Sequence, residues 1–246
     1  MDLIKVPLGG FNAMKKRAAA LIILLIFSFT LVSCGKKQEE TPVVRNPLYQ
    51  LNPPSPGDTI VTITTSRGTI SAVLYSKLVP DTVNNFIKLA DSGYYDGMLI
   101  HKVIKDFVIQ MGDPTLAGNG GESFTGEGLP VEYNEMLHNF TGALGMAAGP
   151  DGLSYSQFYI VAGAPVSEEY VAAMKDAGFA ANVIAAYEEL GGLPSLDYEY
   201  TVFGQVYEGL ELVQEISGVK ADKYNRPKKD IVVSSVSVTS YTVPES

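Results

Sequence analysis

The chain has 246 residues, of which 46% are hydrophobic, with ten Phe, fourteen Tyr and no Trp. This composition predicts one globular domain with appendages, because a chain of this length can bury a sizeable core. The net charge is −9, and the first 33 residues hold four basic side chains and one acidic side chain, a balance of +3, which leaves −12 for the remainder. So acidic a remainder argues against nucleic acid as a partner and against a basic patch for anionic lipid.

The N-terminus has the order of an export signal. Basic residues at 15–17 precede an apolar run from 18 to 32, and small residues follow. The run is about 15 residues long, shorter than the roughly 20 that a spanning helix needs, so we expect residues 1–33 to be a signal peptide and not a membrane anchor. Met14 begins a stretch that is a complete signal peptide by itself, which makes it an alternative start of the protein.

Cys34 is the single cysteine of the chain and excludes an internal disulfide. The sequence Leu-Val-Ser-Cys at 31–34 resembles the bacterial lipobox, which implies a lipid on Cys34 and a place in the bacterial cell envelope, anchored to a membrane on its extracytoplasmic side. The alternative is a free thiol that happens to follow a signal peptide. Residues 34–58 contain five Pro and no periodicity, and we expect them to form a tether.

The domain is expected to begin with a β-hairpin and a helix. Two alternating segments, 60–65 and 69–75, flank Ser66-Arg67-Gly68, a pattern typical of a hairpin. Pro80 then begins a helix, and Gly93 ends it. The apolar residues of this helix recur at helical spacing, at Val83, Phe86, Ile87 and Ala90.

The segment 99–114 is the most informative one. It predicts two apolar strands, 99–104 and 107–111, into which His101, Lys102 and Gln110 are set. Alternation places His101 and Lys102 on opposite faces of their strand. These residue types alone are also typical of a half-buried core histidine beside a solvated lysine.

This segment resembles the signature of the cyclophilin family of peptidyl-prolyl cis-trans isomerases. The family pattern runs Phe-His-Arg-Val-Ile, two residues, Phe-Met, any residue, Gln-Gly-Gly-Asp. Here it stands as Ile100-His101-Lys102-Val103-Ile104, then Phe107-Val108, then Gln110-Met111-Gly112-Asp113. Further blocks in the family's order, at 80–97, 138–147, 156–160, 196–216 and 226–241, extend the resemblance over about 60–241.

The resemblance implies a mainly β fold over residues 59–243, a closed antiparallel eight-stranded barrel capped by two helices. Residues 164–192 are an insertion relative to small cyclophilins, and Ser167, Gly178 and Gly191 delimit a helical hairpin within it. We expect the hairpin to pack on the barrel rim, with an influence on partner choice as the alternative. The Gly-rich stretch 118–128 lacks Lys and predicts a surface loop, which in the family lines the substrate groove.

The implied activity is isomerisation of prolyl peptide bonds in exported polypeptides, by a monomer without metal or cofactor. The implied catalytic residues are Lys102, which stands where the family has Arg, His101 and Gln110. The implied substrate-binding residues are Phe107, Val108, Ala147, Ala148, Gln157, Tyr159, Leu196 and Tyr200. His138 is expected to be a polar cap before a strand, because no second His lies near it to make a metal site.

Two rival functions follow from the same residues. Lys102 lacks the planar fork of an arginine, so the chain is expected to be a slow isomerase or, alternatively, a non-catalytic module that binds proline-containing segments. A lipoprotein β-barrel that carries a small apolar ligand is a different class, and it predicts a cavity inside the barrel.

Overall fold

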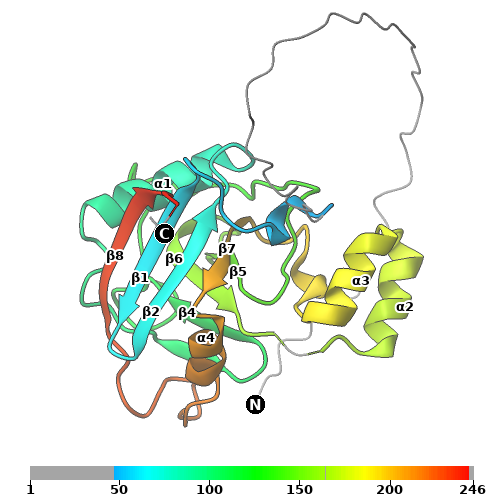
Figure 1. The fold of residues 1–246 in the computed structure, drawn as a ribbon. Coiled ribbons are helices and arrows are strands. Elements are labelled where there is room, and N and C mark those ends of the chain that lie inside the picture. Colours follow the sequence, from blue (N-terminus) through cyan, green and yellow to red (C-terminus); the bar gives the residue numbers. More distant parts are fainter. Residues whose placement is uncertain (1–46, 164, 244–246) are drawn as a thin grey trace, which may run out of the picture. The chain divides into compact units, whose positions relative to one another are not determined.

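The computed structural model describes residues 47–163 and 165–243, where eight β-strands and four α-helices follow one another (Figure 1). The strands are β1 Thr59–Thr65, β2 Gly68–Leu74, β3 Lys102–Ile104, β4 Val108–Met111, β5 Ala143–Ala148, β6 Ser154–Val161, β7 Val202–Glu208 and β8 Val233–Ser240. The helices are α1 Pro80–Asp91, α2 Glu168–Ala177, α3 Ala181–Leu190 and α4 Leu210–Ser217, with the 3-10 turns η2 Tyr49–Leu51 and η3 Pro194–Leu196. The signal peptide at 1–33, the alternative start at Met14 and the lipid on Cys34 fall outside the described residues.

The residues just before β1 are part of the fold. The sequence places 34–58 in a tether, of which 34–46 lie outside the described residues. Gln50 is 1% exposed and donates hydrogen bonds of 2.8 Å to the His138 carbonyl and to Gln205 Oε1. The Tyr75 hydroxyl donates to the Gln50 carbonyl at 3.0 Å. Because a buried amide held by such bonds fixes the backbone around it, this end of the expected tether packs on the domain.

All eight strands form one antiparallel sheet, in the order β3-β4-β6-β5-β7-β2-β1-β8. The expectation of a closed barrel is wrong, because the sheet is an open half-barrel with β3 and β8 at its edges. Strand β3 has three residues, and an isolated bridge from Leu99 to Val232 joins the chain before it to the chain before β8. Beyond the bridge, the Val103 amide bonds to the Asn225 carbonyl in a loop, so no second ladder closes the sheet there.

The main core lies between helix α1 and the sheet. Val83 and Phe86 of α1 are fully buried, and the ring of Phe86 lies 5.2 Å from Phe158 of β6 and 5.1 Å from Phe203 of β7. This is the apolar stripe that the helical spacing predicts. Phe158 therefore projects from β6 toward α1, and alternation places Tyr159 on the opposite face of the strand.

Helices α2 and α3 form the hairpin expected between 164 and 192 and lie side by side (Figure 1). Ser167 caps α2 by accepting the Tyr170 amide at 3.4 Å, and Gly178 ends it with a φ of 83°. The hairpin has its own apolar cluster, in which the rings of Phe140 and Tyr187 are 4.5 Å apart. None of the helices within residues 47–163 and 165–243 has the length and apolar composition needed to span a membrane.

Candidate active site

Three strands align the central candidate residues in one row. Lys102 of β3 pairs with Gln110 of β4, and Gln110 pairs with Tyr159 of β6. Directly paired residues of antiparallel strands project from the same face of a sheet. Lys102, Gln110 and Tyr159 therefore share a face, and Phe158, the neighbour of Tyr159 on β6, projects from the opposite face.

Two glutamines connect this row to the neighbouring loop. Gln110 Nε2 donates to Gln157 Oε1 at 2.8 Å, and Gln157 Nε2 donates to the Gly120 carbonyl at 2.7 Å. Gln157 lies two residues before Tyr159 on β6, so alternation places both on one face. The two hydrogen bonds set the direction of both side-chain amides.

Lys102 is half-buried, and burial lowers the pKa of its ammonium group from the ordinary value of 10.5. No carboxylate lies within ion-pair distance of Lys102 in the part of the chain that the structure describes. A half-buried ammonium group without a carboxylate partner keeps its donors for a ligand with a carbonyl or nitrogen acceptor.

His101 is 5% exposed, and its backbone amide donates to the Gln110 carbonyl at 3.1 Å. Neither ring nitrogen has a hydrogen-bond partner among the described residues. Burial lowers the pKa of the imidazole from its ordinary value of 6.5. The ring is therefore held in its neutral form, and it packs beside the backbone that carries Gln110 and Lys102.

Tyr159 is 5% exposed, and burial raises the pKa of its phenol well above the usual range. Its hydroxyl donates to Asn139 Oδ1 at 2.8 Å. The paired residue on β5 is Gly145, where a Cβ atom would overlap the Tyr159 ring. The absence of a side chain at Gly145 is thus what lets this ring lie across the neighbouring strand.

The remaining residues expected to bind a proline ring surround this row in different degrees. Phe107 is half-buried at the end of the turn before β4, and Val108 is 3% exposed within the main core. Leu196 and Tyr200 are joined by a hydrogen bond from the Tyr200 amide to the Leu196 carbonyl at 3.3 Å. The Tyr200 ring stands edge-on to Tyr159, with centroids 6.1 Å apart. Val108 therefore offers less surface to a ligand than Phe107, Leu196 and Tyr200, which are half-buried.

A pocket of about 330 Å³ lies next to Gln157. It brings together three predicted residues, Ala147, Ala148 and Gln157, with the Gly-rich segment 119–121. Its remaining lining residues, which the sequence analysis did not identify, are Gly149, Pro150, Asp151 and Tyr155. Gly149, Pro150 and Asp151 lie in the short loop after β5, and Tyr155 lies in β6; no charge pattern or motif in the sequence marks them as a site.

The Gly-rich segment beside the pocket is held by Asp113, which is fully buried. Asp113 Oδ1 accepts the amide and the hydroxyl of Thr115 at 2.8 and 2.7 Å, and Oδ2 accepts the Gly118 amide. Burial raises the pKa of this carboxyl, but the hydrogen bonds together outweigh burial and lower it. The surface loop expected at 118–128 is thereby tied to the end of β4.

Asn139 is a further polar residue at this site that the sequence did not predict. It is fully buried and accepts the Tyr159 hydroxyl. The one signal for it is its place beside His138, directly before a strand. His138 is itself 2% exposed and lies 2.8 Å from an oxygen of Asp197, so it is part of a buried network and not a surface cap. No group of three or more His, Cys, Asp or Glu side chains suited to a metal ion occurs within the described ranges.

Comparison with known proteins shows which protein family the sequence matches. Residues 60–238 match the family model described as cyclophilin type peptidyl-prolyl cis-trans isomerase/CLD. A protein of Staphylococcus aureus strain USA300, named "Putative peptidyl-prolyl cis-trans isomerase", is 38% identical over 182 residues, 74% of this chain and 92% of that protein. A protein of Staphylococcus epidermidis with the same name is 38% identical over 178 residues, 72% of this chain and 90% of its own length.

Solved structures are similar as well. A crystal structure of a Cryptosporidium parvum cyclophilin type peptidyl-prolyl cis-trans isomerase has a TM-score of 0.60 and 28% identity, over 75% of this chain and 99% of that one. A second structure of the parasite protein, in the presence of the dipeptide Ala-Pro, has a TM-score of 0.59 and 29% identity, over 74% of this chain and 99% of the other.

Proposed function

This chain belongs to the cyclophilin-type peptidyl-prolyl cis-trans isomerase family, and from that premise we propose that it isomerises prolyl bonds in exported polypeptides while anchored to a membrane by a lipid on Cys34. The observation that carries the proposal is the row of Lys102, Gln110 and Tyr159 on one face of the sheet. The row combines a cationic donor, an amide and an aromatic ring.

The reaction needs these three kinds of group. Rotation about a prolyl bond breaks amide resonance over a barrier of about 20 kcal/mol, and it takes tens to hundreds of seconds unaided. No nucleophile and no proton transfer are required. A catalyst needs an apolar surface for the proline ring, hydrogen bonds for the flanking peptide, and a donor near the prolyl nitrogen, whose lone pair is exposed only in the twisted state.

We assign Lys102 as the donor to the prolyl nitrogen. Its ammonium group has no carboxylate partner in the described part of the chain, so it can turn to a substrate. Gln110, oriented by Gln157, holds the flanking peptide group, and the buried neutral His101 supports the backbone beneath them. A single donor aimed at the transition state is worth about 2 to 4 kcal/mol, which is roughly a 30- to 1000-fold change in rate.

The apolar surface for the proline ring is assigned to Tyr159, Tyr200, Leu196 and Phe107. The rings of Tyr159 and Tyr200 meet edge to face. Together with the neighbouring aliphatic groups, the two rings can enclose the small ring of a proline. Ala147 and Ala148 line the adjacent pocket and are assigned to the residues that flank proline. Peptides that contain proline are therefore the proposed partners, and the enzyme acts as a monomer without metal or cofactor.

A non-catalytic binding module is the second candidate, and the observation that favours it is Lys102 itself. An ammonium group lacks the bidentate geometry of the guanidinium in the family pattern, so the site can bind a peptide and turn it over slowly or not at all. Refolding of an exported protein that has a slow prolyl phase separates the two candidates. An isomerase shortens the slow phase at substoichiometric concentration, whereas a module that only binds leaves its rate unchanged or lowers it.

The place in the cell envelope is tested separately, with the full chain expressed in bacteria. We expect to find the protein in the membrane fraction, with the mass of a chain that begins at a lipid-modified Cys34. A Cys34→Ser variant is expected to be released from that fraction. Retention of the Cys34→Ser variant with the same processed mass would contradict the lipid anchor and leave the isomerase proposal intact.

A further inference from the structure

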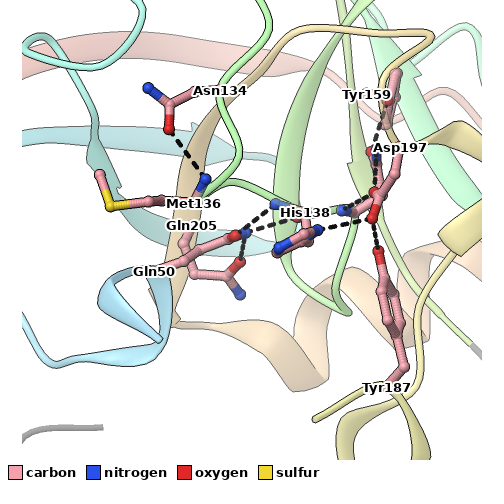
Figure 2. Close-up of polar contacts among 9 residues, drawn as sticks. Gln50, Asn134, Met136, His138, Tyr159, Tyr187, Asp197 and Gln205 are labelled. Carbon is pink, nitrogen blue, oxygen red and sulfur yellow. Dashed lines mark hydrogen bonds and ion pairs between the residues drawn. The ribbon is translucent and has the colours of Figure 1, made fainter. Parts of the chain in front are cut away.

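The hydroxyl of Tyr159 ends a chain of buried hydrogen bonds that runs to Asp197 (Figure 2). Tyr159 Oη donates to Asn139 Oδ1 at 2.8 Å, and Asn139 Nδ2 donates to Asp197 Oδ1 at 3.0 Å. The backbone amide of Asn139 donates to the same carboxylate oxygen at 2.7 Å. Tyr159 is thus connected to Asp197 through one side-chain amide.

The other oxygen of Asp197 has two partners of its own. The Tyr187 hydroxyl, from helix α3, donates to Oδ2 at 2.8 Å, and His138 Nδ1 lies 2.8 Å from the same atom. The Asp197 side chain is fully buried, as is Tyr187. A buried carboxylate is costly unless donors surround it, so these contacts fix its position. One of the groups that hold it comes from the helical hairpin (Figure 2).

The carboxylate also sets the direction of the chain. A carboxylate surrounded by donors acts as an acceptor, so the Asn139 side chain must present its NH₂ group to Asp197. Asn139 Oδ1 then faces Tyr159, whose hydroxyl must be the donor. If Asp197 shifts, the amide of Asn139 loses its orientation, and the Tyr159 hydroxyl loses a fixed acceptor.

The position of the Tyr159 ring matters for the site. The ring lies across Gly145 and meets Tyr200 at 6.1 Å, and its strand position is paired with Gln110. A small tilt of this ring changes the apolar surface directly beside Gln110. Tyr159 therefore transmits changes in the buried network to the surface that binds the peptide.

We propose that Asp197 is a positioning residue of the isomerase site and that Tyr187 connects the hairpin α2–α3 to it. This inference rests on the proposed function. Asp197 and Tyr187 act through Asn139 and Tyr159, so the hairpin sets the affinity of the site for proline-containing peptides in addition to packing on Phe140 and Leu51.

The test uses a hydroxyl deletion that keeps the packing. Tyr187→Phe removes one donor to Asp197 and keeps the ring that contacts Phe140 at 4.5 Å. Tyr170→Phe is the matched control, because Tyr170 lies on α2 of the same hairpin and is 48% exposed. For isomerisation of an Ala-Pro peptide we expect Tyr187→Phe to raise KM ~2- to 10-fold with little change in kcat, and Tyr170→Phe to change neither.

A second background separates positioning from a general structural effect. In a Tyr159→Phe protein there is no hydroxyl to position, so the addition of Tyr187→Phe is expected to leave KM unchanged. An equal rise of KM in both backgrounds would overturn the proposal. A lower melting temperature of Tyr187→Phe with an unchanged KM in the native background would overturn it as well.

A peptide-free readout keeps this inference distinct from the proposed function. The ring resonances of Tyr159, assigned by NMR, are expected to shift in Tyr187→Phe and to stay in place in Tyr170→Phe. If the native protein does not accelerate prolyl exchange, the proposed function is wrong. The Tyr159 resonances would still show whether Tyr187 positions the Tyr159 ring. Unchanged Tyr159 resonances in Tyr187→Phe would show that the hairpin does not reach the site.

Discussion

Gln110 and Gln157 are joined by a hydrogen bond of 2.8 Å from Nε2 of the first to Oε1 of the second. Because Gln157 also donates to the Gly120 carbonyl, the Gly-rich loop determines which end of the Gln110 amide faces the row of site residues. The loop and β6 therefore form one polar unit, although 37 residues separate Gly120 from Gln157 along the chain.

The first prediction concerns this pair. Gln157→Leu keeps the volume of the side chain and removes both hydrogen bonds, so Gln110 loses its fixed orientation. We expect KM for an Ala-Pro peptide to rise ~2- to 10-fold, as for the loss of one oriented hydrogen bond. Steady-state kinetics measure this, with Gln214→Leu on the exposed face of α4 as the control. An unchanged KM in Gln157→Leu would show that Gln110 does not hold the peptide.

The second prediction concerns Gly145. Gly145→Ala places a methyl group where the Tyr159 ring lies, so the ring must move. Overpacking of this kind costs about 1 to 3 kcal/mol of unfolding free energy, and peptide affinity is expected to fall with it. Chemical denaturation and peptide titration measure the two effects. Gly218→Ala is the control, because the backbone at Gly218 has an ordinary conformation and the added methyl group meets atoms no closer than 3.7 Å. This variant is expected to bind the peptide as the native protein does.

The third prediction concerns pH and His101. Burial lowers the pKa of this imidazole in the folded state below 6.5, so the unfolded chain binds a proton first as the pH falls. The stabilising contribution is complete above pH 6.5 and is lost as the pH falls through the lowered pKa, with a slope of at most about 1.4 kcal/mol per pH unit. His101→Leu is expected to lose less stability than the native protein between pH 7 and 5 in denaturant titrations. Equal slopes for the two proteins would contradict a neutral buried His101.

Periodicity and turn chemistry predicted the local structure well. Pro80 begins α1, and Ser167 and Gly178 delimit α2. These features depend on neighbours within a few residues, so the sequence contains their cause. Family resemblance implied the eight-stranded sheet and supplied the candidate site residues.

The features that were not predicted depend on contacts between distant segments. The register that aligns Lys102, Gln110 and Tyr159 is a property of three strands, and the open edge at β3 follows from how a loop near Asn225 approaches it. The packing of Gln50 in the expected tether and the bond from Tyr159 to Asn139 are likewise long-range. A polar residue in a Pro-rich segment gives no local sign that it will be buried.

Prolyl exchange in an Ala-Pro peptide, followed by NMR for the native protein, Lys102→Ala and Lys102→Arg, tests the central claim most directly. NMR measures the exchange rate without a coupled protease. The same sample therefore reports both the binding of the peptide and the rate at which its prolyl bond isomerises. We expect acceleration by the native protein, a loss of roughly 30-fold or more in Lys102→Ala, and activity at least as high as native in Lys102→Arg. Native-like exchange with Lys102→Ala would contradict Lys102 as the donor, and acceleration by Lys102→Arg alone would show a site that binds peptides without turning them over.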